Sequence, residues 1–271
     1  MKIWSSVGRS VWKLVLLPWR DTSRGLEHSL GSGAPGLLCM SAGLLVGWWI
    51  YVPIHELLHA AACVVTGGAV TELQVDPLYG GDVLGRIFPF VTAGGDYAGR
   101  LSGFDTGGSD LVYLATVAGP YVLTVFPGVW LLHWASTPGR WAVSRAALYG
   151  AALPVALAPF VSLPGDAYEL GSILTTWLPP WSAHADLLRG DDAFRVGGSL
   201  LEAALGTGGS FPASPVSSWV LGSGLAVGLV VGGLWAFLTY ALGAWTARSL
   251  QPGPGSGLTP RHPPTGPADR S

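Results

Sequence analysis

The sequence has few charged residues, few cysteines and no asparagine. Only 11% of its 271 residues are charged, against about 25% in an average soluble protein, and 49% are hydrophobic. This composition excludes an ordinary soluble enzyme and predicts an integral membrane protein, in agreement with a mean hydropathy of +0.45. A formal net charge of −2 gives no support for nucleic-acid binding.

The two cysteines, Cys39 and Cys63, both lie in the first apolar segment. They cannot form a disulfide framework, and the chain has no CxxC pair, so a zinc site would have to use histidine and carboxylate ligands. Cys63 follows His59 by four residues, on the same face of a helix. A small buried apolar side chain is nevertheless the more common role for such a cysteine.

The most informative stretch is residues 47–68, GWWIYVPIHELLHAAACVVTGG, where an HExxH motif lies in an apolar run. On a helix this motif places His55 and His59 on one face about one turn apart, which suits two ligands of one Zn²⁺. Glu56 would then lie beside the metal, where a carboxylate can accept a proton from water. Because an ionisable side chain at bilayer depth costs about 2.5–3.5 kcal/mol, three of them in five residues indicate a functional site.

The hydropathy pattern predicts an all-α polytopic membrane protein with about four transmembrane helices and a small β-hairpin after the HExxH helix. A basic amphipathic cytoplasmic segment should precede the membrane core and lie on the membrane surface. The predicted boundaries are 1–35 for this basic segment, 36–180 for the membrane-embedded core with spans at about 37–66, 111–134 and 141–163, 181–216 for a polar extramembrane loop, 217–248 for the last transmembrane helix and 249–271 for a disordered tail rich in Pro and Gly.

The hairpin is predicted directly after the HExxH helix. Residues 69–75, AVTELQV, alternate in polarity and are rich in β-branched types, which is typical of a strand. Gly80 and Gly81 would turn the chain, 82–93 would return as a second strand, and 94–109 would form a loop. The strand at 69–75 could hold an extended substrate by strand addition, or it could serve only to cover the site.

Basic residues predict the orientation of the chain. Ten of the fourteen Lys and Arg residues flank one predicted side of the membrane, and four flank the other. By the positive-inside rule both termini are cytoplasmic, which agrees with four spans. We therefore expect a multi-pass protein of the cell membrane, with the HExxH motif nearer the outer face.

A catalytic zinc takes three protein ligands and keeps one position for water, so the motif needs a third ligand. The candidates are His133, His184, Asp166 and Glu169. The first and third spans should run parallel, because one span lies between them, and Asp166 follows the proline-broken end of the third span at the level of the motif. His133 should lie near the opposite face. Asp166 is the predicted ligand, with a helix N-cap as its alternative role, and Glu169 and His184 remain candidates.

Three motifs together resemble the site-2 proteases, a family of intramembrane zinc metalloproteases. HELLHAAACVVTGGAVTELQV is similar to the family's first core helix and the strand that follows it. AGP at Ala118–Pro120 resembles the family's Gly-Pro element, and SLPGDAYEL resembles the segment that ends in its ligand aspartate. The resemblance covers about residues 40–175 and is more specific than HExxH alone.

The resemblance implies a zinc site formed by His55, His59 and Asp166, with Glu56 as the general base. The family usually has Asp-Gly where this chain has Asp166 followed by alanine, and it commonly has an asparagine near each of the second and third motifs. This chain contains no asparagine, and Thr124 is the nearest polar substitute for stabilising an oxyanion. Many relatives also place the site toward the cytoplasm, opposite to the side that the basic residues indicate here.

The predicted function is that of a membrane-embedded zinc metalloendopeptidase acting on membrane-associated substrates. Glu56 would accept a proton from the attacking water and pass it to the departing amine, after a helical substrate has unwound. The predicted partners are a membrane protein or peptide substrate and the lipid bilayer, without nucleic acid. The alternative is a non-proteolytic scaffold or regulatory protein that keeps the metal-binding fold, although Glu56 is intact. A metal transporter is disfavoured, because the sequence has no internal repeat.

Overall fold

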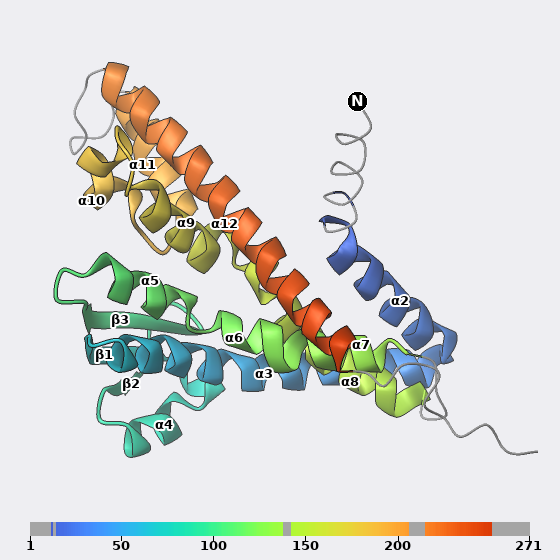
Figure 1. Cartoon of the computed structure of the whole chain (residues 1–271). Coiled ribbons are helices and arrows are strands. Elements are labelled where there is room, and N and C mark those ends of the chain that lie inside the picture. Colours follow the sequence, from blue (N-terminus) through green and yellow to red (C-terminus); the bar gives the residue numbers. More distant parts are fainter. Residues whose placement is uncertain (1–11, 13–14, 138–141, 206–214, 251–271) are drawn as a thin grey trace, which may run out of the picture.

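The computed structural model describes residues 12, 15–137, 142–205 and 215–250. The predicted tail falls outside the described residues from 251 onward, as does 206–214 of the predicted loop. Helices dominate the described part (Figure 1). The helices are α2 (Leu17–Gly31), α3 (Gly33–Val65), α4 (Gly81–Ile87), α5 (Asp110–Ala118), α6 (Tyr121–Leu123), α7 (Val129–Ala135), α8 (Ala142–Val161), α9 (Tyr168–Thr175), α10 (Ala185–Leu188), α11 (Ala193–Leu205) and α12 (Pro215–Ser249), with the short turns η1 (Pro77–Tyr79), η2 (Thr124–Gly128), η3 (Leu163–Ala167) and η4 (Trp181–His184).

Three helical segments are long and apolar enough to cross a membrane, namely Gly33–Val65, Ala142–Thr175 and Trp219–Ser249. The second of them consists of α8 and α9 joined through η3. Asp110–Ala118 and Tyr121–Ala135 are also long and apolar enough when taken together, with a bend of 41° at the break between them. The described chain is therefore mostly helical, with three helices that could span a membrane, or four if the bent pair is one span.

The HExxH helix α3 packs closely against α8. A Cβ atom added to Gly43 would clash with the backbone of Ala147, and one added to Gly47 would clash with that of Ala151. Glycine at such positions lets two helix backbones approach, as is common between transmembrane helices. Because the residue numbers rise together along this contact, α3 and α8 are parallel, as the sequence predicts.

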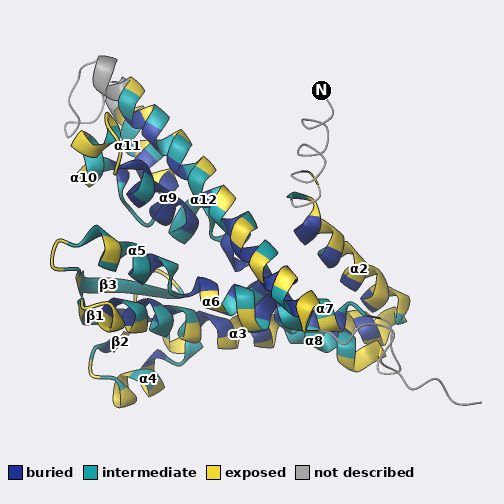
Figure 2. Cartoon of the chain, in the orientation of Figure 1, coloured by how far each residue is buried: buried dark blue, intermediate teal, exposed yellow. Residues whose placement is uncertain are grey.

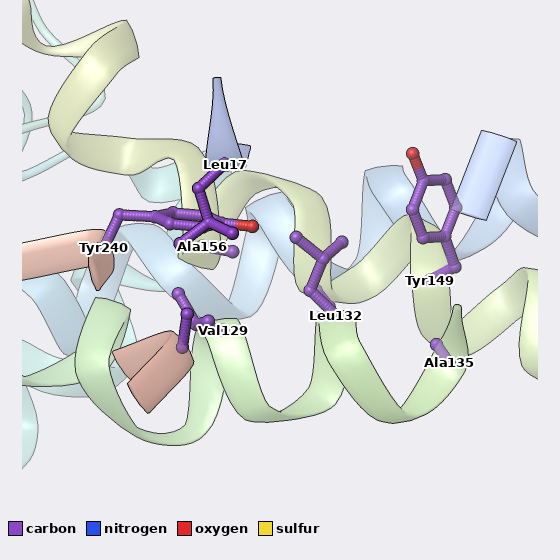
Figure 3. Close-up of a cluster of buried hydrophobic side chains, with 9 residues drawn as sticks. Leu17, Val129, Leu132, Ala135, Tyr149, Ala156 and Tyr240 are labelled. Carbon is purple, nitrogen blue, oxygen red and sulfur yellow. The ribbon is translucent and has the colours of Figure 1, made fainter. Parts of the chain in front are cut away.

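Four helices share a buried core at the end of the molecule away from the sheet (Figures 1 and 3). The Tyr149 hydroxyl of α8 donates a hydrogen bond to the Thr22 carbonyl of α2 at 2.7 Å. Arg248 of α12 contacts the buried Asp21 carboxylate of α2 at 3.4 Å. These contacts hold α2 on the bundle with its buried side inward and its other side exposed (Figure 2). The core residues are Leu17, Val129, Leu132, Ala135, Tyr149, Ala152, Ala156, Tyr240 and Ala244.

The predicted β-hairpin is instead a sheet of three strands in the order β2-β1-β3. β1 (Ala69–Val75) agrees with the prediction, but α4 occupies the start of the predicted return strand, and only β2 (Val91–Ala93) remains of it. Because α4 carries the chain back, β2 pairs with β1 in parallel. β3 (Gly99–Asp105) pairs antiparallel with β1 and lies in the predicted loop. Its sequence, GRLSGFD, lacks an apolar alternation because β3 is an edge strand without a buried face.

Helix α8 runs through Pro154 and Pro159, which the sequence suggests as breaks. A proline has no N–H, so Pro159 leaves the Val155 carbonyl without its usual helical donor. The hydroxyl of Thr124 donates a hydrogen bond to that carbonyl at 3.0 Å. Between α8 and α9 the backbone leaves helical geometry in η3, where Gly165 has φ −99° and ψ −118°. Thr124 thus satisfies the backbone group that the proline frees.

The segment predicted as a polar loop, 181–216, is largely helical over its described part, as α10 and α11. Some of its apolar residues are buried: Ala193 and Val196 of α11 pack on Tyr168 of α9. The Tyr168 hydroxyl also donates a hydrogen bond to the Leu188 carbonyl at the end of α10. Tertiary packing therefore overrides the polar and glycine-rich composition that predicts a loop.

Candidate metal centre

The two motif histidines lie on the inner face of α3, at the level of the sheet. Their Nε2 atoms are 3.1 Å apart, and both side chains are largely buried. The four-residue spacing places them one above the other on the helix, so both imidazoles point to one position in space. The sequence prediction for the geometry of this pair agrees with the structure.

Asp166 of η3 joins the two histidines. Its carboxylate oxygens lie 3.0 Å from His55 Nε2 and 3.7 Å from His59 Nε2. The three ligand atoms lie within 4.8 Å of one another, and this is the one such group of three or more found among the described residues. Two imidazoles and one carboxylate on a single position fit a tetrahedral Zn²⁺ with one site left for water. The other candidates, His133, His184 and Glu169, are not part of this group.

The outer nitrogens of both histidines have hydrogen-bond partners. His59 Nδ1 lies 2.8 Å from the Thr116 carbonyl, which can only accept, so this nitrogen carries the proton and Nε2 keeps its lone pair. His55 Nδ1 lies 2.6 Å from the Tyr51 hydroxyl, one turn earlier on α3. Both partners orient their imidazole rings, and the Thr116 carbonyl also selects the tautomer of His59 that leaves Nε2 free. The donor set is therefore arranged for a metal at the Nε2 side.

Glu56 is 8% exposed and lines a cavity of about 590 Å³ together with His59 and Asp166. The edge strand β3 passes directly over it. A Cβ atom on Gly99 would lie 2.9 Å from Glu56 Cδ, so only glycine leaves room for this carboxylate. The predicted base is thus buried beside the predicted metal ligands, in contact with a strand from the predicted loop.

The cavity is lined by β3, α5, η3 and the segment 190–195. Ion pairs connect these elements: Arg100 of β3 lies 2.7 Å from Asp191, and Arg189 lies 2.6 Å from Asp110 at the start of α5. β1 does not line the cavity and is the central strand of the sheet. Of the two roles suggested for β1, strand addition at the cavity finds no support in this position, because β3 is the edge strand that borders the cavity.

Two further residues considered from the sequence have structural roles. Thr124 is 1% exposed, and its hydroxyl proton is used on the Val155 carbonyl, so it cannot also donate to an oxyanion. Cys63 is fully buried, and its Sγ lies 3.8 Å from the Ala69 carbonyl, away from the metal group. The small buried role expected for Cys63 agrees with this position.

Several residues around the site have no strong signal in the sequence. Tyr51 could have been found, because it precedes His55 by four residues on the same helical face. Thr116 contributes only its carbonyl, and Gly99 contributes only the space of a missing side chain. Neither contribution depends on a side chain, so the roles of both residues could be recognised only from the tertiary structure.

No protein-family model matches the chain, and no curated protein or solved structure matches it either. The relation to the site-2 proteases therefore stays a prediction that rests on the three motifs. The geometry described above stands independently of that relation.

Proposed function

We propose that this protein is a membrane-embedded zinc metalloendopeptidase that hydrolyses peptide bonds of membrane-associated substrates. The observation that carries the proposal is the meeting of His55, His59 and Asp166, from two different helical segments, beside the buried Glu56. Ionisable side chains in an apolar membrane helix cost free energy, so their presence there indicates a functional site. A cavity that leads to Glu56 favours a peptidase over a non-proteolytic scaffold, which has no need of a base or of an access route.

The proposed chemistry assigns one role to each residue. Zinc, when bound to His55, His59 and Asp166, supplies a Lewis acid and lowers the pKa of water to about 7. Glu56 accepts a proton from the attacking water and later donates it to the departing amine. Glu56 lines the cavity beside Gly99, which supports a role toward a peptide that enters this cavity. No covalent intermediate with the protein is required.

The cavity supports an extended rather than a helical substrate. Its volume of about 590 Å³ falls in the usual range of ligand pockets, roughly 300–1,000 Å³. β3 borders it and has one unpaired edge, whose backbone N–H and C=O groups could pair with an added strand. A substrate helix has to unwind to use this edge, which also exposes its carbonyls to attack.

We further propose four spans in the cell membrane, with the bent pair Asp110–Ala118 and Tyr121–Ala135 counted as one, and with both termini in the cytoplasm. Two observations support this arrangement. The pair taken together is long and apolar enough to cross a membrane. The basic residues are concentrated near the termini and in the loop between the second and third spans. The site then lies toward the outer face. Cysteine labelling of residues in α2 from each side of intact cells would test the orientation.

Zinc content is the first test of the site. Purified full-length protein should hold about one zinc, because the site has three protein ligands and one open position. His55→Ala and Asp166→Ala should each lose most of the metal. Full retention of zinc by Asp166→Ala would remove the proposed third ligand and would point to Glu169 or His184.

The second test separates chemistry from metal binding. Glu56→Gln should keep its zinc but stop cleavage, because the amide cannot accept a proton. Membrane fragments should be compared between cells that contain the wild type and cells that contain Glu56→Gln. Glu27→Gln, on the exposed side of α2, is the matched control. A membrane substrate that Glu56→Gln processes as well as the wild type does would refute the peptidase proposal.

A further inference from the structure

A buried tyrosine next to the metal group lacks a hydrogen-bond partner. Tyr121, directly after the Gly-Pro break between α5 and α6, is 7% exposed, and its hydroxyl oxygen is closed off from solvent. This hydroxyl makes no well-formed hydrogen bond to any described residue, although the Ser162 side chain lies close to it. A buried hydroxyl without a partner is costly, so its retention calls for an explanation.

The tyrosine borders a second, much smaller cavity of about 10 Å³. This volume is about what one water molecule needs. Tyr51, His55 and Asp166 line the same cavity, so two of the three proposed metal ligands border it. Asp166 also lines the large cavity, so this residue borders both cavities.

The position of Asp166 explains why a donor is needed there. Without metal, its carboxylate oxygens contact His55 Nε2 and His59 Nε2. When His55 Nε2 binds a metal, it can no longer donate to Asp166, so the carboxylate loses this partner and keeps only the hydrogen bond from its own backbone N–H. A ligating carboxylate normally has its own hydrogen bond, which fixes its orientation.

Three other hydroxyl groups line the small cavity: that of Ser162 lies close to Tyr121, and those of Thr124 and Tyr51 have hydrogen-bond partners of their own. The Thr124 hydroxyl donates to the Val155 carbonyl. The Tyr51 hydroxyl contacts His55 Nδ1, and when it accepts that proton it can still donate its own to a water molecule. A water in the cavity could therefore accept from Tyr51 and Tyr121 and donate to Asp166, which gives it three partners.

We propose that Tyr121 is a positioning residue for the metal centre: its hydroxyl donates to one water molecule in the small cavity, and this water holds Asp166 in the orientation that binds the metal. The proposal rests on the metal site of the proposed function. It assigns Tyr121 no contact with the substrate, and it explains why this buried tyrosine hydroxyl has no hydrogen-bond partner in the protein.

The test compares zinc affinity with stability in the full-length protein in detergent. Zinc affinity is measured by competition with a chelator, and melting is followed after complete removal of metal. Tyr121→Phe should bind zinc about 10- to 100-fold more weakly, as is typical when an outer partner of a ligand is lost. Its metal-free form should melt at the wild-type temperature or above, because no protein hydrogen bond is removed.

Tyr149→Phe is the matched control, because its hydroxyl is buried but donates to the Thr22 carbonyl far from the metal group. This variant should melt lower and keep wild-type zinc affinity. Equal zinc affinity of Tyr121→Phe and wild type would refute the role of Tyr121 alone. A lower melting point of metal-free Tyr121→Phe would also refute it, by showing a structural bond. A wild type that binds no zinc would instead refute the metal site itself.

Discussion

Gly99 offers the sharpest test of how the sheet and the candidate base depend on each other. The change is Gly99→Ala, which adds one methyl group to the edge strand β3. That Cβ would overlap Glu56 Cγ and would lie 2.9 Å from Cδ and 3.2 Å from Oε1. Carbon atoms in contact prefer about 3.5–4.0 Å, so the Glu56 side chain has to move by roughly 1 Å. A displacement of about 1 Å in a catalytic group can cost about 100-fold in rate.

The expected result is a loss of cleavage with the metal site intact. Gly99→Ala should reduce turnover of a substrate identified by the comparison with Glu56→Gln by about 100-fold. Zinc content should stay at the wild-type level, because the metal group is formed by α3 and η3 and not by β3. Turnover, zinc content and melting temperature are measured on the same purified protein.

Gly198→Ala is the control, since an added methyl group there meets nothing within 4 Å. It should keep full turnover and should not lower the melting temperature. Wild-type turnover by a folded Gly99→Ala protein would show that β3 does not restrict Glu56. Loss of zinc by Gly99→Ala would show that the strand acts on the ligands rather than on the base.

Two further changes test the helices that carry the site. Gly47→Ala should separate α3 from α8, because its Cβ would meet the Ala151 backbone; we expect a loss of about 1–3 kcal/mol in unfolding free energy and weaker zinc binding, measured by denaturation in detergent and chelator competition. Thr124→Val should leave the Val155 carbonyl unpaired and lose about 1–3 kcal/mol, while Thr124→Ser keeps the hydroxyl and stays near wild type. If Thr124→Val stopped cleavage without loss of stability, Thr124 would have a catalytic role after all.

The residues that could be predicted are those whose positions follow from helical spacing and chain direction. His55, Glu56 and His59 are neighbours on one helix, so their geometry needs only the period of α3. The prediction of Asp166 requires one more inference, namely that two spans separated by a third run parallel. The contacts of Gly43 and Gly47 with α8 agree with this parallel arrangement. Strand β1 was also recognisable, because its alternation reflects one face that packs on the core.

Residues whose roles depend on distant backbone could not be predicted in this way. β3 has no apolar alternation, because one of its edges is free and it borders a cavity, so its composition indicates a loop. α11 contains glycines and charges, yet it is helical where Ala193 and Val196 find a partner in Tyr168. In both cases the deciding interaction is with a segment that local periodicity cannot identify.

Thr124 and Tyr121 show how far such an interaction can change the assignment of a role. Both follow the Gly-Pro element closely, and Thr124 is the polar group that the sequence suggests for an oxyanion. In the structure the Thr124 hydroxyl donates a hydrogen bond to the carbonyl of Val155, 31 residues away, because Pro159 has no N–H to donate to that carbonyl. A proline in α8 thereby decides the role of a threonine in another segment. On the small cavity that Asp166 also borders, the buried hydroxyl without a hydrogen-bond partner is that of Tyr121, so we propose the tyrosine rather than Thr124 as the polar group that acts on the metal centre.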